Sequence, residues 1–383
     1  MKSLKILAPT RYPWTFNSPR KTRHRVSRRR FAPLNKITWK LEATTAFNPW
    51  PPQRFDLIHA FNRIPLGRTP YIISFESHLP RAMGMEETPY FARLTRMLTS
   101  ERCRGIYAIS QHALDTFRWQ HGVSGALRQL EPKLSLRYPN LVIPNAPDAM
   151  AEQPIEPFVL TFVGGHFARK GGCAAVRLAE LALERDIPLQ INIISNLEMG
   201  GGIWTDPPRP EFYDPYRKRL TLPNVRHFNG LPNSETVGLL ARSHMTLLTT
   251  FSDSFGYSAI EAMANWTPVL GTNQCALPEF VVNGETGVLL DLPTDELGNW
   301  IHSNPPYRNE PRYEEIFAEE TERLAQESLA AIEHLMSNPD TYAAMRRAAR
   351  AKAEAMFNAD DATKFWDDEY ERASKRGKRL SNT

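Results

Sequence analysis

The chain alternates short apolar runs with longer polar stretches in which apolar residues recur at helical spacing. In the first 150 residues the apolar runs occupy positions 4–9, 55–61, 70–78, 105–110 and 140–148. Strands that alternate with longer polar helical segments predict βαβ units and a parallel sheet.

A proline-rich polar segment, 149–157, is typical of a linker, and a second series of the same kind follows it. Its expected strands are 158–165, 188–195, 225–230 and 244–251, with helices at 174–186 and 235–243. The segment from Gly200 to Pro215 predicts a long irregular loop, either functional or disordered. Three helical segments follow Arg312, and Pro339 suits the first turn of the second. We therefore expect two α/β domains, 1–150 and 151–358, with a ligand cleft between them.

Composition limits the class of protein. The 383 residues are 42% hydrophobic, enough for two sizeable cores. Three widely separated cysteines show no zinc or disulfide spacing, which favours a reducing compartment. The N-terminus lacks a signal-peptide core, and no run approaches the length of a transmembrane helix. We expect a cytoplasmic protein.

The net charge of +5 is unevenly distributed, because positions 18–30 carry seven lysines and arginines and no acid. Such a run attracts phosphates on lipids, nucleic acid or a substrate. A solvated basic loop without a specific partner explains it equally well. A peripheral contact of residues 20–30 with the inner membrane face is one expectation, whereas nucleic acid is the less favoured partner.

The segment 162–172, FVGGHFARKGG, contains the first group of chemically suggestive residues. Gly164 and Gly165 permit close backbone approach, and Arg169 and Lys170 precede an expected helix start, which suits a diphosphate. Glycine follows Lys170 where a nucleoside-triphosphate loop has Ser or Thr. The GxGxxG fingerprint is absent too. A plain strand-to-helix turn with exposed basic residues remains an alternative.

The second group lies in the segment 252–272, SDSFGYSAIEAMANWTPVLGT. Gly256 opens an expected helix, flanked by the carboxylates of Asp253 and Glu261. These acids have an ordinary alternative, since Ser258 and Glu261 fit a capping box and Asp253 could cap the turn. Both groups follow strands of one half, and loops at the carboxyl ends of parallel strands gather on one side. Together they suit a sugar-bearing nucleotide diphosphate.

Segments 162–172, 225–233 and 252–290 resemble the GT-B glycosyltransferases of family 4, which are retaining, metal-independent enzymes with two Rossmann-like domains. The resemblance covers most of the chain and is weakest before residue 100. It implies an α/β GT-B fold with two Rossmann-like domains that face a cleft. It also implies that the C-terminal helix, about 359–383, crosses back to the first domain.

The resemblance assigns donor-side roles residue by residue. The family's two spaced glutamates fall on Asp253, expected to contact the donor sugar, and Glu261, expected to hold the ribose. Lys170 matches the phosphate lysine, while the usual arginine falls on Gly165, so Arg169 would replace its charge. The expected donor-binding residues are Gly164, Gly165, Asn229, Leu231, Ser254, Phe255, Gly256, Tyr257 and Glu261.

The acceptor half departs further from the family pattern. In place of a glycine-rich loop after the first strand the chain has TRYPWTFNSPRKTR, which includes Arg20. Where relatives often have a histidine, Glu76 is nearest and His78 lies two residues on. His59 resembles another strand-end position. We expect Glu76 to act with Asp253, Arg169 and Lys170 in catalysis, and His59, His78 and Arg20 to be acceptor-side candidates.

The predicted reaction transfers a sugar from a UDP- or GDP-linked donor to a hydroxyl of a glycan or lipid-linked acceptor. The anomeric configuration would be retained without a metal or other cofactor. The acid pairs Asp360–Asp361 and Asp367–Asp368 are interpreted as solvated helix charges, not metal ligands. A GT-B nucleotide-sugar epimerase, a silent sugar-nucleotide binding protein and a basic-arm binding protein remain alternatives.

Overall fold

The computed structural model describes residues 3–375 apart from residues 11, 33, 35–37, 39–41, 48–52, 83, 123–124 and 152. The chain forms two compact units. Unit 1 comprises Met1–Val142 and Met356–Thr383, and unit 2 comprises Ile143–Ala355. The units divide after residues 142 and 355, whereas the sequence-based boundaries lie after residues 150 and 358.

Unit 1 is built on a six-stranded parallel sheet. In sheet order its strands are β2 (Arg25–Arg29), β1 (Lys5–Pro9), β5 (Leu57–Phe61), β7 (Tyr71–Phe75), β8 (Cys103–Ala108) and β9 (Leu134–Leu136). Strands β3 (Phe31–Ala32), β4 (Thr44–Phe47) and β6 (Ile64–Pro65) form a small second sheet. The helical segments are α1 (Tyr12–Phe16), α2 (Pro89–Thr99), α3 (Gln111–Gly122), α4 (Leu127–Leu130), η3 (Glu131–Lys133) and α12 (Ala359–Ser374).

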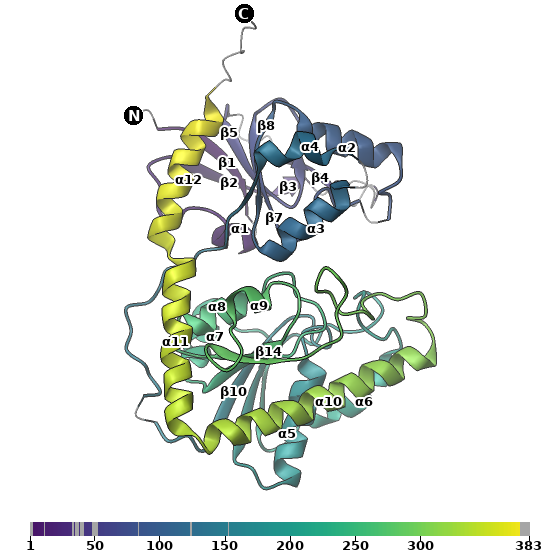
Figure 1. Ribbon diagram of the computed structural model, residues 1–383, viewed down its shortest axis with the longest axis vertical. Helices are drawn as coiled ribbons and strands as arrows, with labels where there is room; N and C mark the ends of the chain where they lie inside the picture. The colour runs from purple at the N-terminus through teal and green to yellow at the C-terminus, as the bar shows by residue number, and fades with distance from the viewer. Residues whose placement is uncertain are drawn as a thin grey trace, which may run out of the picture. The chain divides into compact units, whose positions relative to one another are not determined.

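Adjacent residues of the unit 1 strands enter different cores, as the period of two in a strand requires. Leu7 and Ile58 pack with residues of α2 and α3, whereas Ile6 and Leu57 pack against Trp366 of α12. The helix α12, drawn in yellow in Figure 1, therefore covers one face of the first sheet. The predicted return of the C-terminal helix is confirmed up to Ser374, and residues 376–383 lie outside the described residues.

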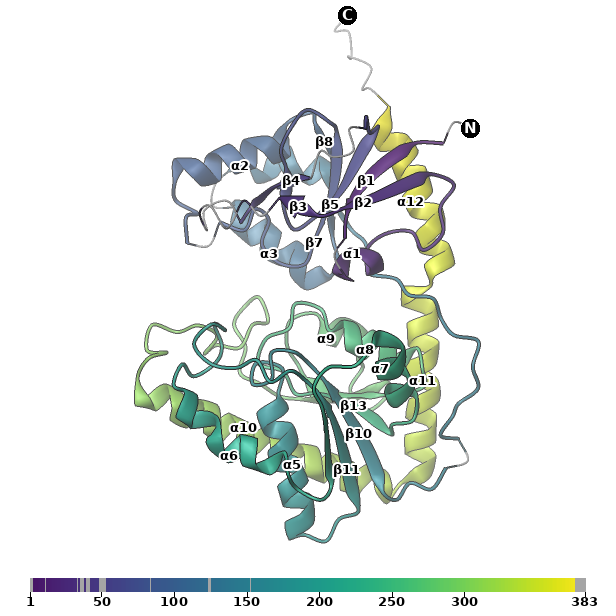
Figure 2. The same cartoon turned by 180° about the vertical axis from the view of Figure 1, so that it is seen from behind.

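Unit 2 contains a second six-stranded parallel sheet. In sheet order its strands are β12 (Val225–Phe228), β11 (Leu189–Ile194), β10 (Phe158–Val163), β13 (Met245–Leu248), β14 (Val269–Thr272) and β15 (Gly287–Leu290). The helical segments are α5 (Gly172–Glu184), η4 (Pro210–Tyr213), α6 (Asp214–Arg219), α7 (Asn233–Ala241), α8 (Tyr257–Met263), α9 (Leu277–Phe280), α10 (Pro311–Met336) and α11 (Pro339–Phe357). Within this unit α7 and α8 lie on one face of the sheet and α5 and α10 on the other (Figures 1 and 2).

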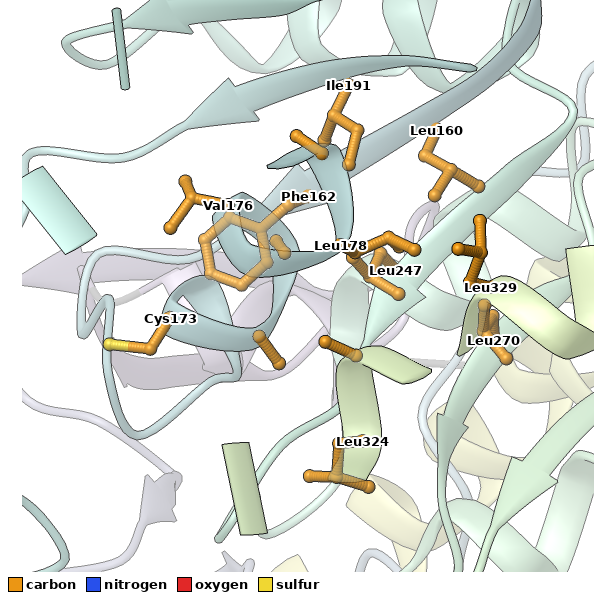
Figure 3. Close-up of a cluster of buried hydrophobic side chains, with 14 of the residues drawn as sticks. Leu160, Phe162, Cys173, Val176, Leu178, Ile191, Leu247, Leu270, Leu324 and Leu329 are labelled. Carbon is orange, nitrogen blue, oxygen red and sulfur yellow. The ribbon is translucent and has the colours of Figure 1, made fainter. Parts of the chain in front are cut away.

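The main core of unit 2 lies between its sheet and the helices α5 and α10. Leu160, Ile191 and Leu247 come from three neighbouring strands, while Leu178 belongs to α5 and Leu329 to α10 (Figure 3). All five are 1% exposed or less. Because each fully buried side chain of this size contributes roughly 2 kcal/mol, this layer fixes the strands whose ends carry the candidate site.

Two local predictions about secondary structure are wrong. The segment from Asn140 forms no strand among the described residues, only a bridge between Leu141 and Asn358. Its backbone instead donates to Phe16 and Phe357, and Pro144 lacks a donor for a ladder. In contrast, Arg25–Arg29, for which a solvated basic loop is one of the alternatives, forms the edge strand β2 and pairs with β1 throughout its length.

Candidate donor site

The turn that follows β10 is held close to the end of β13. Gly171 has φ +90°, and a Cβ there would lie 2.2 Å from the carbonyl oxygen of Thr249, so this approach requires glycine. The amide of Phe251 donates to the carbonyl of Arg169 over 2.8 Å, and the hydroxyl of Thr250 donates to the same oxygen over 3.0 Å. The two chemically suggestive segments therefore lie side by side.

The closest charged contact in this region joins Lys170 to Asp253. Lys170 Nζ lies 2.9 Å from Asp253 Oδ2, and the side chains are 20% and 13% exposed. Burial acts to raise the pKa of Asp253, but the positive charges of Lys170 and Arg169 outweigh it and the pKa is lowered. Asp253 is thus a carboxylate at neutral pH, aligned by a cation that a phosphate could share.

Arg169 lies in the same pair of loops but is largely enclosed by protein. Its Nε donates to His166 Nδ1 over 3.1 Å, and its Nη1 donates to the carbonyl of Ser252. The guanidinium also lies over the ring of Trp204, 5.1 Å from the centroid. With only 9% of its surface exposed, Arg169 fixes the loops and adds positive potential more than it offers free donors.

Glu261 occupies a different place from the one that a capping box requires. The helix α8 begins at Tyr257, its N-cap is Gly256 with φ +86°, and no side chain caps it. Ser258 therefore lies inside the helix, so the capping-box alternative for Glu261 is wrong. Glu261 is 9% exposed and accepts a 3.0 Å hydrogen bond from the Asn233 amide at the start of α7. This hydrogen bond connects α8 to the first residue of α7.

The remaining donor-side residues differ in what they can offer a ligand. Asn229 is exposed and Leu231 half-buried in the turn after β12, where Gly230 has φ +78°. Ser254 and Tyr257 are half-buried beside Asp253. Phe255 is 1% exposed and packs on Phe280, so only its backbone could meet a ligand. Gly164 and Gly165 follow β10 directly, and a Cβ on Gly164 would come 2.7 Å from the Lys170 side chain.

The sequence interpretation missed several residues that contact this region. His166 approaches Glu198 after β11, with Nε2 and Oε2 3.3 Å apart. Trp204 lies in the predicted irregular loop, and the residue is 46% exposed. Arg308 donates to the carbonyls of Gly201, Ile203 and Asp206 in that loop, which explains its defined course. Long-range contacts of this kind leave no local pattern in the sequence.

His59 has an environment that does not fit the expected substrate contact. Its Nδ1 is 2.8 Å from the Tyr370 hydroxyl and its Nε2 3.2 Å from Ser74 Oγ, and the residue has no exposed surface. Burial lowers its pKa to about 3. The ring also lies 4.5 Å from that of Trp366. His59 is therefore a neutral residue of the packing between β5 and α12.

The other acceptor-side candidates lie at or near the surface of unit 1. Glu76 follows β7, accepts a 2.9 Å hydrogen bond from the Asn62 amide and pairs with Arg81. His78 is exposed two residues farther on. Arg20 donates to the carbonyl of Asn140 over 2.7 Å. Glu76 thus has a fixed orientation at a strand end, whereas Arg20 has a structural partner.

The acidic pairs of the C-terminal helix only partly match their interpretation as solvated charges. Asp360 and Asp361 are exposed, but Asp367 is 5% exposed and accepts hydrogen bonds from the Thr22 hydroxyl and the Arg23 amide. Asp367 therefore binds part of the basic segment. Among the described residues no group of three or more His, Cys, Asp or Glu side chains could hold a metal ion. In the same part of the chain, no helix is long and apolar enough to span a membrane.

Solved structures of glycosyltransferases share this arrangement of elements. A glycosyltransferase from Rickettsia africae is 13% identical with a TM-score of 0.61, over 98% of this chain and 100% of the other. HepE of Anabaena in complex with UDP and glucose has a TM-score of 0.59 at 13% identity, over 94% and 98%. The fold is GT-B. These likenesses concern the fold, since the sequence identities are low.

The sequence similarity to known proteins is strongest in unit 2. Residues 156–301 match the family model for the glycosyl transferases group 1. The D-inositol 3-phosphate glycosyltransferase of Corynebacterium diphtheriae is 32% identical over 139 residues, or 36% of this chain. That match spans about a third of the curated relative's length, 32%. The segment that the family model matches includes Lys170, Asp253 and Glu261, so the similarity to group 1 glycosyl transferases covers the candidate site.

Proposed function

We propose that this protein is a retaining glycosyltransferase of family 4 that moves a sugar from a nucleotide-diphospho-sugar to an acceptor hydroxyl. The observation that carries the proposal is the 2.9 Å contact between Lys170 and Asp253, and the buried Glu261 lies on the helix α8 that follows the same strand end. A cation for the diphosphate and two carboxylates for hydroxyl groups are then present at adjacent strand ends. These are the groups that such a donor requires.

Lys170 would bind the diphosphate and stabilise the negative charge that develops as the glycosidic bond breaks. A positive group that is already positioned favours the transition state over the ground state. Asp253 would accept hydrogen bonds from the donor sugar, and Glu261 would accept them from the ribose. Arg169 would add positive potential from its place between the loops. With these charges we propose that no metal ion is needed.

A UDP-linked donor is favoured over a GDP-linked one, because HepE, with a similar fold, is known in complex with UDP. The acceptor is proposed to be a glycan or a lipid-linked glycan, with Glu76 and His78 as acceptor-side groups. We propose a cytoplasmic protein that touches the inner membrane face through residues 20–30. In that segment Lys21, Arg25 and Arg30 are exposed.

Thermal shift and calorimetric titration with UDP, GDP and their sugar conjugates test the donor site, because a ligand of the folded state raises the melting temperature. We expect a UDP-sugar to bind, and Lys170→Ala to weaken binding and lower transfer by about 100-fold. Lys170→Arg should retain part of both, and Lys218→Ala, an exposed lysine of α6, should leave both unchanged. The proposal fails if no nucleotide binds or if Lys170→Ala matches the wild type.

Two readouts separate transfer from the other activities. Product analysis by NMR with the donor and a glycan acceptor should give an acceptor glycoside of unchanged anomeric configuration. An epimerised donor without acceptor would instead support the epimerase alternative. Turnover that persists after treatment with EDTA is the result expected for a reaction without a metal ion.

A further inference from the structure

Unit 1 contains an open pocket of about 650 Å³ beside α2. It is lined by Arg93, Arg96, Met97, Ser100 and Arg102, and we refer to it as the arginine pocket. All of these residues belong to unit 1, whereas the donor site described above consists of unit 2 residues. The pocket therefore shares no residue with the candidate donor site.

The sequence of α2 explains why the arginines face outward. Its buried residues are Phe91, Leu94, Thr95 and Leu98, which recur at helical spacing. Arg93 and Arg96 are three positions apart, so they lie on one face of the helix, and both are exposed. The turn from α2 to β8 then brings Arg102 to the same pocket.

The three guanidinium groups have no carboxylate partner among the described residues. The guanidinium groups of Arg93 and Arg96 form neither a hydrogen bond nor an ion pair with a residue that the structure describes. Arg102 lies over the Tyr71 ring, 4.8 Å from its centroid, and donates through Nη2 to the carbonyl of Pro65. Its buried Nε has no hydrogen-bond partner in the described part of the chain.

The partly buried arginines of unit 1 fall into two groups. Arg63 pairs with Glu42 and Arg81 with Glu76, whereas Arg104 and Arg137, like Arg102, have a buried Nε without a hydrogen-bond partner among the described residues. Burial lowers the pKa of Arg102, as expected for a cation that loses water without gaining an anion. An anion in the pocket would supply the missing partner.

The negative end of α2 does not account for the three charges. Lys133 Nζ donates to the carbonyls of Leu98, Thr99 and Ser100 over 3.1, 2.7 and 2.7 Å. These are the carbonyls at the C-terminus of the helix, which lack partners inside it. Since Lys133 already satisfies them, the arginines remain available to a ligand.

We propose that the arginine pocket binds the phosphate group of a phosphate monoester or diester. Planar guanidinium groups donate paired hydrogen bonds to phosphate oxygens, and an arginine cluster is the usual recognition device for this group. The volume exceeds that of a phosphate ion and leaves room for an attached sugar or glycerol. The ligand is either a small phosphorylated molecule or an anionic lipid headgroup, which share this chemistry.

Calorimetric titration with glycerol 3-phosphate tests the proposal with the full-length protein. The variant Arg93→Gln/Arg96→Gln alters only exposed helix positions, so it should fold normally. We expect its dissociation constant to rise at least about tenfold, which corresponds to the loss of about one charge-assisted hydrogen bond. The control Arg54→Gln/Arg347→Gln removes the same charge at exposed sites, and its affinity should match the wild type. Arg102→Lys, which keeps the charge but loses the planar fork, should weaken binding separately.

Phosphate compounds could also occupy the donor site, so every titration is repeated in the Lys170→Ala background. Binding that survives this change and disappears with Arg93→Gln/Arg96→Gln supports the proposal. Sedimentation with phosphatidylcholine vesicles, with and without phosphatidylglycerol, then separates the sources. Arginine-dependent binding to the anionic vesicles alone identifies a lipid headgroup, and binding of glycerol 3-phosphate alone identifies a soluble ligand. Equal losses in the pocket and control variants, no binding of either probe, or binding that requires Lys170 would overturn it.

Discussion

Polar residues in or just after the central strands have different environments in the two units, and His59, expected at a strand end, lies in the middle of β5. In unit 2, Lys170 and Asp253 meet at the ends of β10 and β13 and remain partly exposed. In unit 1, His59 lies on an equally central strand, but its ring is enclosed by Trp14, Trp366 and Tyr370. Two six-stranded parallel sheets thus use polar residues differently, one for a candidate site and one for packing.

The C-terminal helix accounts for this difference. Trp366 and Tyr370 of α12 cover the face of the first sheet that contains Ile6, Leu57 and Ile72. Arg23, just before β2, pairs with the Asp368 and Glu371 carboxylates of the same helix. The helix α12, which is distant in sequence, therefore packs on or pairs with His59 and Arg23. From the sequence alone these polar side chains could be taken for ligand-binding residues.

The largest effect should follow from removing the central contact of α12. Trp366→Ala deletes a side chain that is 1% exposed and packs on His59 and Tyr107, and such truncations cost about 3–5 kcal/mol of stability. Hydrogen exchange measured by mass spectrometry should show the loss in unit 1, while unit 2 keeps its protection and nucleotide binding. Trp119→Ala, at a 58% exposed position, is the control and should change little. Equal loss in both units would contradict this division.

Asp253→Asn should have the next largest effect, and it acts on unit 2. The amide keeps the shape but removes the charge that aligns Lys170, so kcat/KM should fall about 100-fold, or roughly 2.7 kcal/mol. Steady-state kinetics with the nucleotide-sugar that binds in the titrations measure the fall in kcat/KM. Asp360→Asn, an exposed acid of α12, should behave like the wild type. Asp253→Glu adds one methylene and should alter sugar preference more than folding. Unchanged kinetics of Asp253→Asn would remove this residue from the site.

The sequence predicts the architecture well because a strand or helix leaves a periodic pattern. Both parallel sheets and the strand-end turns around Lys170 and Asp253 follow from such patterns. The edge strand Arg25–Arg29 could not be predicted, since it is stabilised by pairing with β1 and not by apolar residues of its own. The contacts of Arg169 with Trp204, and of His59 with Tyr370, join segments far apart in sequence and required the structure.

One buried histidine in each unit should make the stability of that unit depend on pH. Burial lowers the pKa of His59 to about 3 and that of His244 in unit 2 to about 4, against an unfolded value near 6.5. The unfolded chain therefore binds more protons below pH 6.5, so each unit loses up to about 1.4 kcal/mol per pH unit as pH falls toward the folded value. Hydrogen exchange from pH 7 to 5 should show this. His59→Asn should flatten the dependence in unit 1 only, and an unchanged slope there would contradict the assignment.

Substitution of Glu76 should have the smallest effect on activity and stability. This residue follows β7, is half-buried, and has a carboxylate held by Asn62 and Arg81. Glu76→Gln keeps an oxygen for the Asn62 amide but removes the charge that pairs with Arg81. Since a partly exposed ion pair contributes about 1 kcal/mol at most, the melting temperature should fall only slightly. As a proposed acceptor-side group, Glu76 should still lower kcat/KM for the acceptor about fivefold. Donor affinity should stay at the wild-type value.

Arg81→Gln removes the other partner of the same ion pair and so separates a structural role of Glu76 from a role at the acceptor. If Arg81→Gln reproduces the whole loss of kcat/KM, Glu76 only supports the loop after β7. Unit 1 then has no strand-end carboxylate with a role comparable to that of Asp253.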